Sequence, residues 1–165
     1  MPAEAPSATA RARLAAMQAE LVAALTGKAA TPAGFCAHRI RAAAVSLAVK
    51  RRGAVARAWP GLAEELGAHY AERFAAYASL TPLPSSGGPL ADGRVFVDWL
   101  ERRGERLDGC RLQAMAVDLR HARTANGLVP RRGASLRIAR LGNPRRLVVG
   151  LRLPWLGERW LQLPF

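Results

Sequence analysis

The spacing of apolar residues changes once along the chain, close to residue 128. Before that point, apolar side chains recur every three or four residues, which is the period of an amphipathic helix. This period predicts five helices, over about residues 9–26, 35–58, 60–78, 92–100 and 108–126. Residues that end helices separate them: Gly27, the pair Trp59-Pro60 and the Pro- and Ser-rich connector 81–91.

Each predicted helix has an apolar face that we expect to be buried. The residues of these faces are Leu14, Met17, Leu21 and Leu25 in the first helix, Ile40, Ala44, Leu47, Ala54 and Ala58 in the second, Leu62, Leu66, Tyr70, Phe74 and Tyr77 in the third, Val95, Phe96, Trp99 and Leu100 in the fourth, and Leu112, Met115 and Leu119 in the fifth. Cys36 and Cys110 are interpreted as small buried apolar residues. Asp92 and Asp108 stand where the fourth and fifth helices take a capping residue.

After residue 128 the period shortens to that of strands. Segments 134–141, 145–153 and 158–163 are rich in apolar residues, and two tight connectors join them, which predicts an antiparallel three-stranded meander. Apolar residues alternate with polar or small ones: Leu136, Ile138 and, after a slip of one position, Leu141; then Leu147, Val149, Leu151 and Leu153. An isolated three-stranded sheet needs a cover over its apolar face, so we expect the fifth helix or a partner to supply it.

The two patterns together predict an α+β fold, with an N-terminal five-helix bundle followed by a small antiparallel three-stranded β-meander. They divide the chain into a disordered N-terminus (1–8), a helical domain (9–127) and a small basic β-rich segment (128–165). The N-terminus lacks the apolar stretch of a secretory signal, and apolar runs elsewhere are too short to span a membrane. We therefore expect a cytoplasmic protein that has no membrane partner.

The net charge of +13 is concentrated in the C-terminal third of the chain. Residues 111–165 carry eleven arginines against Asp118 and Glu158, a net charge of +9. A patch of this kind attracts nucleic acid, an acidic peptide or another acidic surface. The alternative is a solvated arginine-rich surface that reflects the codon use of a GC-rich genome.

Residues with the spacing of catalytic motifs are scarce. His38, His69 and His121 are scattered, and the sequence contains no nucleophile elbow, phosphate loop or dinucleotide fingerprint. Glu65, His69 and Glu72 are spaced for one helical face, which suits a metal site but is equally the spacing of an ordinary exposed helix pair. We therefore expect no catalytic residues, no cofactor and no metal, in a protein that is not an enzyme.

The binding residues that we expect lie on the predicted strands and are Arg137, Arg140, Arg145, Arg146, Arg152 and Trp160. Basic side chains interleaved with aromatic ones suit single-stranded nucleic acid, because bases stack on aromatic rings. Trp155 and Trp160 are also suited to cover the core of the small sheet, and we favour that interpretation. A free edge of the sheet can instead bind an extended peptide as an additional strand, and the arginines would then select an acidic peptide.

Several short segments between residues 35 and 100 follow one another in a specific order. They are Arg39-Ile40-Arg41, Ala54-Val55-Ala56-Arg57-Ala58-Trp59-Pro60-Gly61-Leu62, Leu66-Gly67, Phe74-Ala75-Ala76-Tyr77, Pro82-Leu83-Pro84-Ser85 and Gly93-Arg94-Val95-Phe96-Val97-Asp98-Trp99-Leu100. This order resembles the DNA-binding domain of HvfC/BufC-type proteins. The Ala- and Arg-rich composition is most similar to the actinobacterial branch, in which the domain is also found fused to an oxidase.

This resemblance implies a non-catalytic accessory protein rather than an enzyme. Family members accompany multinuclear non-haem iron oxidases that modify cysteine-containing ribosomal peptides, and they are thought to present the precursor peptide. We therefore expect the helical face to bind the oxidase and the sheet to bind a ribosomal precursor peptide. The alternative is a nucleic-acid-binding protein that uses the same arginine-rich strands.

Overall fold

The protein is described by a computed structural model that covers residues 8–105, 107–142 and 145–164. The chain divides into two compact units, Met1–Lys50 and Arg51–Phe165, which we describe separately. The expected disordered N-terminus falls outside the described residues up to position 7, as do residues 143–144 of the first tight connector. No helix in the described part of the chain is long and apolar enough to cross a membrane.

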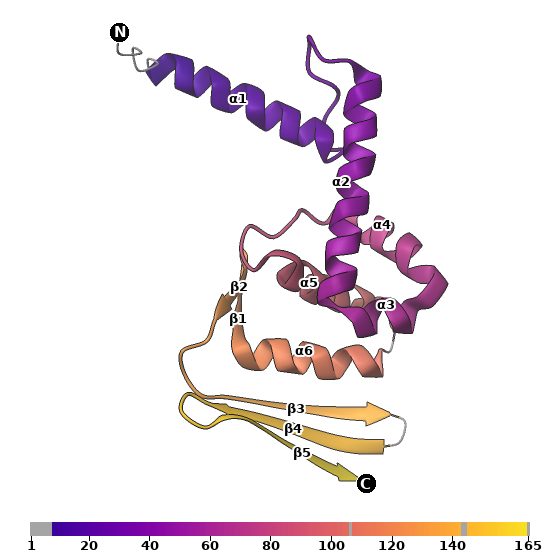
Figure 1. Cartoon of the computed structure of the whole chain (residues 1–165), viewed down its shortest axis with the longest axis vertical. Helices are drawn as coiled ribbons and strands as arrows, with labels where there is room; N and C mark the ends of the chain where they lie inside the picture. Colours follow the sequence, from indigo (N-terminus) through magenta and orange to yellow (C-terminus); the bar gives the residue numbers. More distant parts are fainter. Residues whose placement is uncertain (1–7, 106, 143–144, 165) are drawn as a thin grey trace. The chain divides into compact units, whose positions relative to one another are not determined.

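The described residues form helices first and strands afterwards, so the predicted α+β class is confirmed (Figure 1). The helices are α1 (Ala8–Leu25), α2 (Ala37–Ala58), α3 (Pro60–Leu66), the 3-10 helix η1 (Gly67–His69), α4 (Tyr70–Leu80), α5 (Gly88–Arg102) and α6 (Asp108–Arg120). The strands are β1 (His121–Thr124), β2 (Gly127–Pro130), β3 (Ser135–Gly142), β4 (Arg145–Leu153) and β5 (Gly157–Pro164). The last three make the predicted antiparallel meander, in the order β3-β4-β5.

The first unit contains α1 and most of α2, and it buries little apolar surface. Among its described residues, Ala24 alone is buried. Leu14, Met17 and Leu47 are 55%, 51% and 47% exposed, so the prediction that they form core positions is wrong. Cys36 is also exposed, contrary to expectation. The physical reason is that the described part of this unit offers these residues no third helix or strand to pack against.

The second unit has an aromatic core built by α3, α4, α5 and the end of α2. All five core residues predicted in the third helix are buried: Leu62, Leu66, Tyr70, Phe74 and Tyr77. Phe96 of α5 lies at their centre, with ring centroids 5.1 Å from Phe74 and 4.9 Å from Tyr77. Such ring pairs stabilise a core beyond the area that they bury. Cys110, Met115 and Leu119 of α6 are also buried as predicted.

Two details of the helices differ from the prediction. The single helix expected over 60–78 is divided at Gly67, whose φ of +50° ends α3 and begins η1. Asp92 is not a cap, because α5 begins at Gly88, one turn earlier, after Gly87 with φ +82°. Asp92 is instead completely buried and binds the guanidinium of Arg51 through two bonds of 2.7 and 2.8 Å.

The segment after α6 contains a hairpin that the sequence pattern did not predict. The fifth helix was expected to continue to residue 126, but α6 ends at Arg120 and β1 pairs with β2 in antiparallel register from His121↔Pro130 to Thr124↔Gly127. The Asn126-Gly127 pair belongs to the hairpin turn instead of a helix terminus. This dipeptide is a common hairpin signal because glycine adopts positive φ there without strain, and Gly127 has φ +131°.

Candidate functional site: the C-terminal sheet

One face of the β3-β4-β5 sheet is covered by α6, which runs along it (Figure 1). The Ser135 hydroxyl on β3 donates a 2.7 Å hydrogen bond to the carbonyl of Leu119. Leu141 and Val148 pack with Met115 in a small buried cluster. A Cβ added at Gly150 would lie 2.7 Å from the Leu119 side chain, so this glycine allows α6 to approach the sheet closely. The helix therefore rests on small side chains.

The apolar row predicted from the sequence lies on the opposite face of the sheet. Register places Ile138 beside Val149 and Leu161, and Leu136 beside Leu151. Ile138 is 60% exposed and Leu161 54% exposed, so the fifth helix, one of the two expected covers, does not cover this row, and the other, a partner, stays a prediction. Leu141 belongs to the helix-covered face, in agreement with the slip in its alternation. We call the uncovered side the outer face; its residues are Leu136, Ile138, Arg140, Arg145, Leu147, Val149, Leu151, Leu153, Arg159, Leu161 and Leu163.

The charged residues of the outer face all carry the same sign. They are Arg140 on β3, Arg145 on β4 and Arg159 on β5, and all three are exposed. The sequence places no Asp or Glu among the outer-face residues. The one acidic residue on these strands is Glu158, which lies on the helix-covered face and pairs with Arg120 of α6 at 2.5 Å. The outer face is therefore aliphatic with a purely positive rim.

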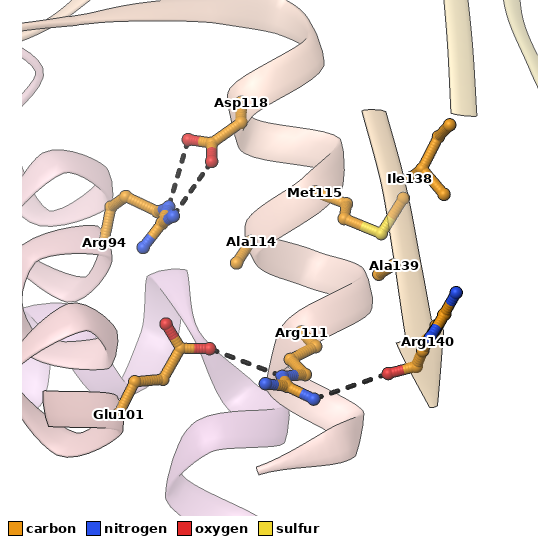
Figure 2. A pocket seen from close by; sticks show the side chains of 9 residues that line it. All are labelled: Arg94, Glu101, Arg111, Ala114, Met115, Asp118, Ile138, Ala139 and Arg140. Atoms are coloured by element: carbon orange, nitrogen blue, oxygen red, sulfur yellow. Dashed lines mark hydrogen bonds and ion pairs between the residues drawn. The ribbon is translucent and has the colours of Figure 1, made fainter. Parts of the chain in front are cut away.

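The outward edge of β3 borders a groove of about 350 Å³ between this strand, α6 and α5 (Figure 2). Its apolar lining comes from Ala114, Met115, Ile138 and Ala139, and its polar lining from arginines and acids on α5 and α6 and from Arg140 of β3. Figure 2 shows the carbonyl of Arg140 turned toward Arg111, 3.4 Å away, while the Arg140 side chain leaves the strand on the other side. At the end of the strand, the N–H of Gly142 donates to Asp108 at 2.9 Å. Asp108, predicted as a helix cap, thus binds β3.

These two bonds show which backbone groups of β3 point toward the groove. In an antiparallel pair, alternate residues turn their N–H and C=O toward the same side. Because Arg140 and Gly142 use these groups on the groove side, Leu136 and Ile138 turn theirs to that side as well. The middle of this edge has no neighbouring strand among the described residues. The carbonyl of Leu136 already accepts a 2.8 Å hydrogen bond from the Arg137 guanidinium, so an added strand would pair chiefly with the backbone of Ile138.

The charges that α5 and α6 contribute to the groove are already paired, whereas the Arg140 side chain of β3 has no acidic partner among the described residues. Arg94, which is 7% exposed, forms two bonds of 2.9 and 3.0 Å to Asp118 and one of 2.5 Å to Asp98. Arg111 lies 3.4 Å from Glu101. Paired charges of this kind fix the walls of the groove and leave the backbone of β3 as its main binding element.

The six binding residues predicted from the sequence do not lie on one surface. Arg140 and Arg145 belong to the outer face, whereas Arg137, Arg146, Arg152 and Trp160 lie on the helix-covered face. Three of the latter group have side-chain bonds: Arg137 to the carbonyl of Leu136, Arg146 to Gln162 and Arg152 to the carbonyl of Arg131. Each of these guanidiniums therefore already donates a hydrogen bond within the chain, and the three residues are half-buried.

The two tryptophans of this segment have different surroundings. Trp160 packs over Gly150, since a Cβ there would meet its ring at 2.8 Å, and it is 40% exposed. This position agrees with the interpretation that Trp160 covers the core of the sheet. Trp155, in the turn between β4 and β5, is 96% exposed and covers nothing.

Sequence reasoning missed two residues of the site. Arg159 was not singled out, although its position two residues before Leu161 places it on the same face of β5. Arg111 was not linked to β3, and nothing in its sequence neighbourhood indicates the contact. The alternation of Leu147, Val149, Leu151 and Leu153 did identify an apolar face, but it could not show which side α6 covers.

The remaining candidate residues from the sequence are the possible metal-binding set on the third predicted helix and the buried cysteine. Glu65, His69 and Glu72 belong to α3, η1 and α4, so no single uninterrupted helical face carries all three. Glu65 instead accepts a 3.1 Å hydrogen bond from the N–H of Cys110. Burial, together with Glu65, raises the pKa of the Cys110 thiol far above its ordinary value, which disfavours the nucleophilic thiolate.

Comparisons with known proteins relate the helical part of the chain to a family. The family described as "SCO6045-like, C-terminal domain" matches residues 15–102, which is more than half of the 165 residues and spans α1 to α5. A "UPF0276 protein" of Streptomyces avermitilis is 37% identical over 103 residues, which cover 62% of this chain and 21% of that relative. The chain thus spans about one fifth of the relative's length. No solved structure matches the chain. The chain belongs to the family of the SCO6045-like C-terminal domain.

Proposed function

We propose that the chain is a non-catalytic accessory protein that binds a multinuclear non-haem iron oxidase and presents a ribosomal precursor peptide to it. The observation that carries this proposal is the edge of β3, which has no neighbouring strand among the described residues and borders a groove of about 350 Å³. An extended peptide that adds to a sheet edge gains main-chain hydrogen bonds, and the neighbouring pockets select its side chains. Such binding requires no catalytic group.

The chemistry of the peptide follows from the charges near β3. Arg137 and Arg140 flank Ile138 on this strand, and the residues from 111 onward carry a net charge of +9. A peptide with acidic residues on either side of a short apolar stretch would match both features. Its side chains would alternate between the groove and the outer face, because successive side chains of a strand point to opposite sides.

The identity of the partner rests on the family resemblance and on the Streptomyces avermitilis relative. In that "UPF0276 protein", the stretch similar to this chain accounts for 21% of the length, so the relative carries a much larger region on the same polypeptide. A domain that is covalently joined to another region in one protein is a reasonable binding partner for such a region when the two are separate. The segments between residues 35 and 100 that resemble HvfC/BufC-type proteins suggest that this region is an iron oxidase.

Affinity purification tests the proposal. The tagged full-length chain is isolated from its own cells, the recovered proteins are identified by mass spectrometry, and iron is measured in the eluate. We expect an iron-containing protein in stoichiometric amount. Recovery of the chain alone, or together with nucleic acid only, would contradict the proposal.

A retardation assay tests the nucleic-acid alternative separately. Random-sequence single- and double-stranded oligonucleotides are titrated with the purified chain at low salt and again at about 0.2 M salt. A nucleic-acid-binding protein would bind them at low salt and lose affinity steeply as counterions compete. We expect weak retardation at low salt and none at the higher concentration.

A further inference from the structure

We propose that the outer face of the β3-β4-β5 sheet is the docking surface for the partner protein, whose matching surface is aliphatic at its centre and rimmed by carboxylates. This inference rests on the proposed function, because it assigns a surface to the partner named there. It also replaces the expectation that the oxidase binds the helical face. The outer face suits this role in its apolar area, its charge and its position next to the β3 edge.

The outer face has more large aliphatic side chains than the face that α6 covers. It presents Leu136, Ile138, Leu147, Val149, Leu151, Leu153, Leu161 and Leu163. The helix-covered face has Leu141 and Val148 as its large aliphatic residues, beside Ala139 and Gly150. The two edge strands leave their outer-face residues uncovered, with Leu136 at 52% and Leu163 at 45% exposure. A continuous apolar patch of this kind is typical of an interaction surface.

The charge of the outer face selects an acidic partner. Arg140, Arg145 and Arg159 are its charged residues, and none has an acidic side-chain partner within the described part of the chain. A second copy of this chain would bring three more arginines and a further net charge of +13 against them. Carboxylates on a different protein would pair with these guanidiniums, so complementarity favours that occupant.

Nucleic acid fits this face less well than a protein does. Single strands bind on aromatic platforms, whereas none of the described outer-face residues is aromatic and Trp160 lies on the opposite side. Aliphatic side chains at the centre of a phosphate-binding surface would lose contact with water without gaining a stacked base. A protein surface with its own aliphatic centre buries these side chains directly.

The position of the face explains how a bound peptide would be presented. A peptide strand added to the edge of β3 would extend the outer face by one strand. Every second side chain of the peptide would stand in line with Ile138 and Leu136. A partner docked on the outer face would contact those side chains directly, whereas α6 occupies the other side of the sheet.

Affinity measurements with a matched pair of variants test the inference. The outer-face variant Arg159→Glu/Leu161→Glu alters exposed residues of β5, two strands away from the β3 edge. The helical control Arg41→Glu/Leu47→Glu makes the same changes at exposed positions of α2. The probe is the iron-loaded oxidase purified from the same cells, titrated by isothermal calorimetry, and circular dichroism verifies the fold. Arg159→Glu alone serves as the second variant if the double variant unfolds.

The outcomes separate this inference from the proposed function. We expect the outer-face variant to lose at least tenfold in affinity for the oxidase and the helical control to stay within twofold of wild type. Equal affinity of wild type and outer-face variant, or loss in the helical control alone, overturns the docking surface and leaves the proposed function intact. Absence of binding by wild type overturns the proposed function, and this inference with it. A wild-type dimer that the outer-face variant dissociates, seen by light scattering, would assign the face to a second copy instead.

Discussion

The helical core of the second unit encloses its apolar side chains, whereas the C-terminal sheet exposes them on its outer face. Trp59, Tyr77 and Phe96 are fully buried, and Phe74 is 1% exposed. By contrast, Leu136, Ile138 and Leu161 on the sheet are each more than half exposed. The difference indicates that the helical core supplies most of the stability of the isolated unit, and that the outer face of the sheet is available for binding.

The two regions also differ in how they satisfy their charges. Asp92, at the centre of the helical core, accepts hydrogen bonds from Arg51 and, at 2.7 Å, from the hydroxyl of Tyr77. Burial, together with the hydrogen bond to Asp92, raises the pKa of Tyr77, so the phenol stays protonated and donates. The arginines of the outer face have no such acceptors among the described side chains. A paired buried charge contributes to a structure, and unpaired exposed charges are free to recruit a partner.

The largest effect that we expect is the loss of Asp92. The variant Asp92→Ala removes the carboxylate from the largely buried guanidinium of Arg51 and from the hydroxyl of Tyr77, which keep only the backbone carbonyls of Thr81 and of residue 92 as acceptors. We expect a decrease of about 3–5 kcal/mol in the free energy of unfolding, measured by urea denaturation. Asp92→Asn is the control, because it keeps the shape and one acceptor oxygen and should lose less. Similar losses in both variants would mean that the charge alone matters.

The second-largest loss of stability should follow from adding a methyl group at Gly93, where α5 packs against Trp59. In an open helix, Gly→Ala is stabilising, yet a Cβ at Gly93 would lie 2.2 Å from the Trp59 ring. The indole N–H also donates to the carbonyl of Leu90 at 3.1 Å, which restricts how far the ring can move. We expect Gly93→Ala to destabilise the unit by about 1–3 kcal/mol in urea denaturation.

Gly61→Ala is the matched control for that variant. Its Cβ would meet nothing closer than the Gln113 side chain at 3.9 Å, so it should be neutral or stabilising. A stabilising effect of Gly93→Ala would show that the Trp59 side chain moves aside, and the helical core would then be less tightly packed than the structure indicates.

The two faces of the sheet should respond differently to the loss of an aliphatic side chain. Val148, on the helix-covered face, is fully buried, so Val148→Ala should cost about 1–2 kcal/mol of unfolding free energy. Leu161 is 54% exposed, so Leu161→Ala should change the stability of the isolated chain by less than about 0.5 kcal/mol. Thermal unfolding of both variants measures the difference. A larger loss in Leu161→Ala would mean that the outer face is already covered in the isolated chain.

The helical core could be predicted from the sequence because its apolar residues repeat without interruption. Leu62, Leu66, Tyr70, Phe74 and Tyr77 are four or three residues apart, and all are buried. The break at Gly67 did not disturb their common face. The same period in α1 gave the wrong result for Leu14 and Met17, because periodicity shows which side of a helix is apolar but not whether another element covers it.

The sheet was predicted in its strands and order but not in its orientation. A period of two places Leu147 and Val149 on one face of the sheet and Val148 and Gly150 on the other. It does not show which of the two faces is buried. The choice depends on the small residues Ser135 and Gly150 under α6, which is a tertiary contact. The groove beside β3 has the same origin, since Arg94, Arg111 and Asp118 line it from helices distant in the sequence from β3.

A further small effect that we predict concerns the ion pair that joins the sheet to α6. Glu158 on β5 binds Arg120 through bonds of 2.5 and 2.9 Å, and this hydrogen bonding lowers the pKa of the Glu158 carboxyl. A carboxyl whose pKa is lower in the folded chain than in the unfolded chain stabilises the fold above its ordinary pKa. This contribution is lost as the pH falls through the folded value. Because Arg120 is 57% exposed, solvent screening limits the contribution to about 1 kcal/mol or less.

Unfolding of Glu158→Gln at two pH values measures this contribution. At pH 7 the variant should be less stable than wild type by that amount, and the difference should shrink as the pH is lowered toward 3 and the folded carboxyl begins to take up its proton. Added salt at pH 7 should also reduce it, because an exposed ion pair is screened. Glu64→Gln, at an exposed position of α3, is the control and should change little at either pH. If the variant and wild type differ in unfolding free energy by the same amount at pH 7 and pH 3, the charge of Glu158 does not stabilise the fold. Glu158 would then hold β5 against α6 by packing, as side chains do in the helical core.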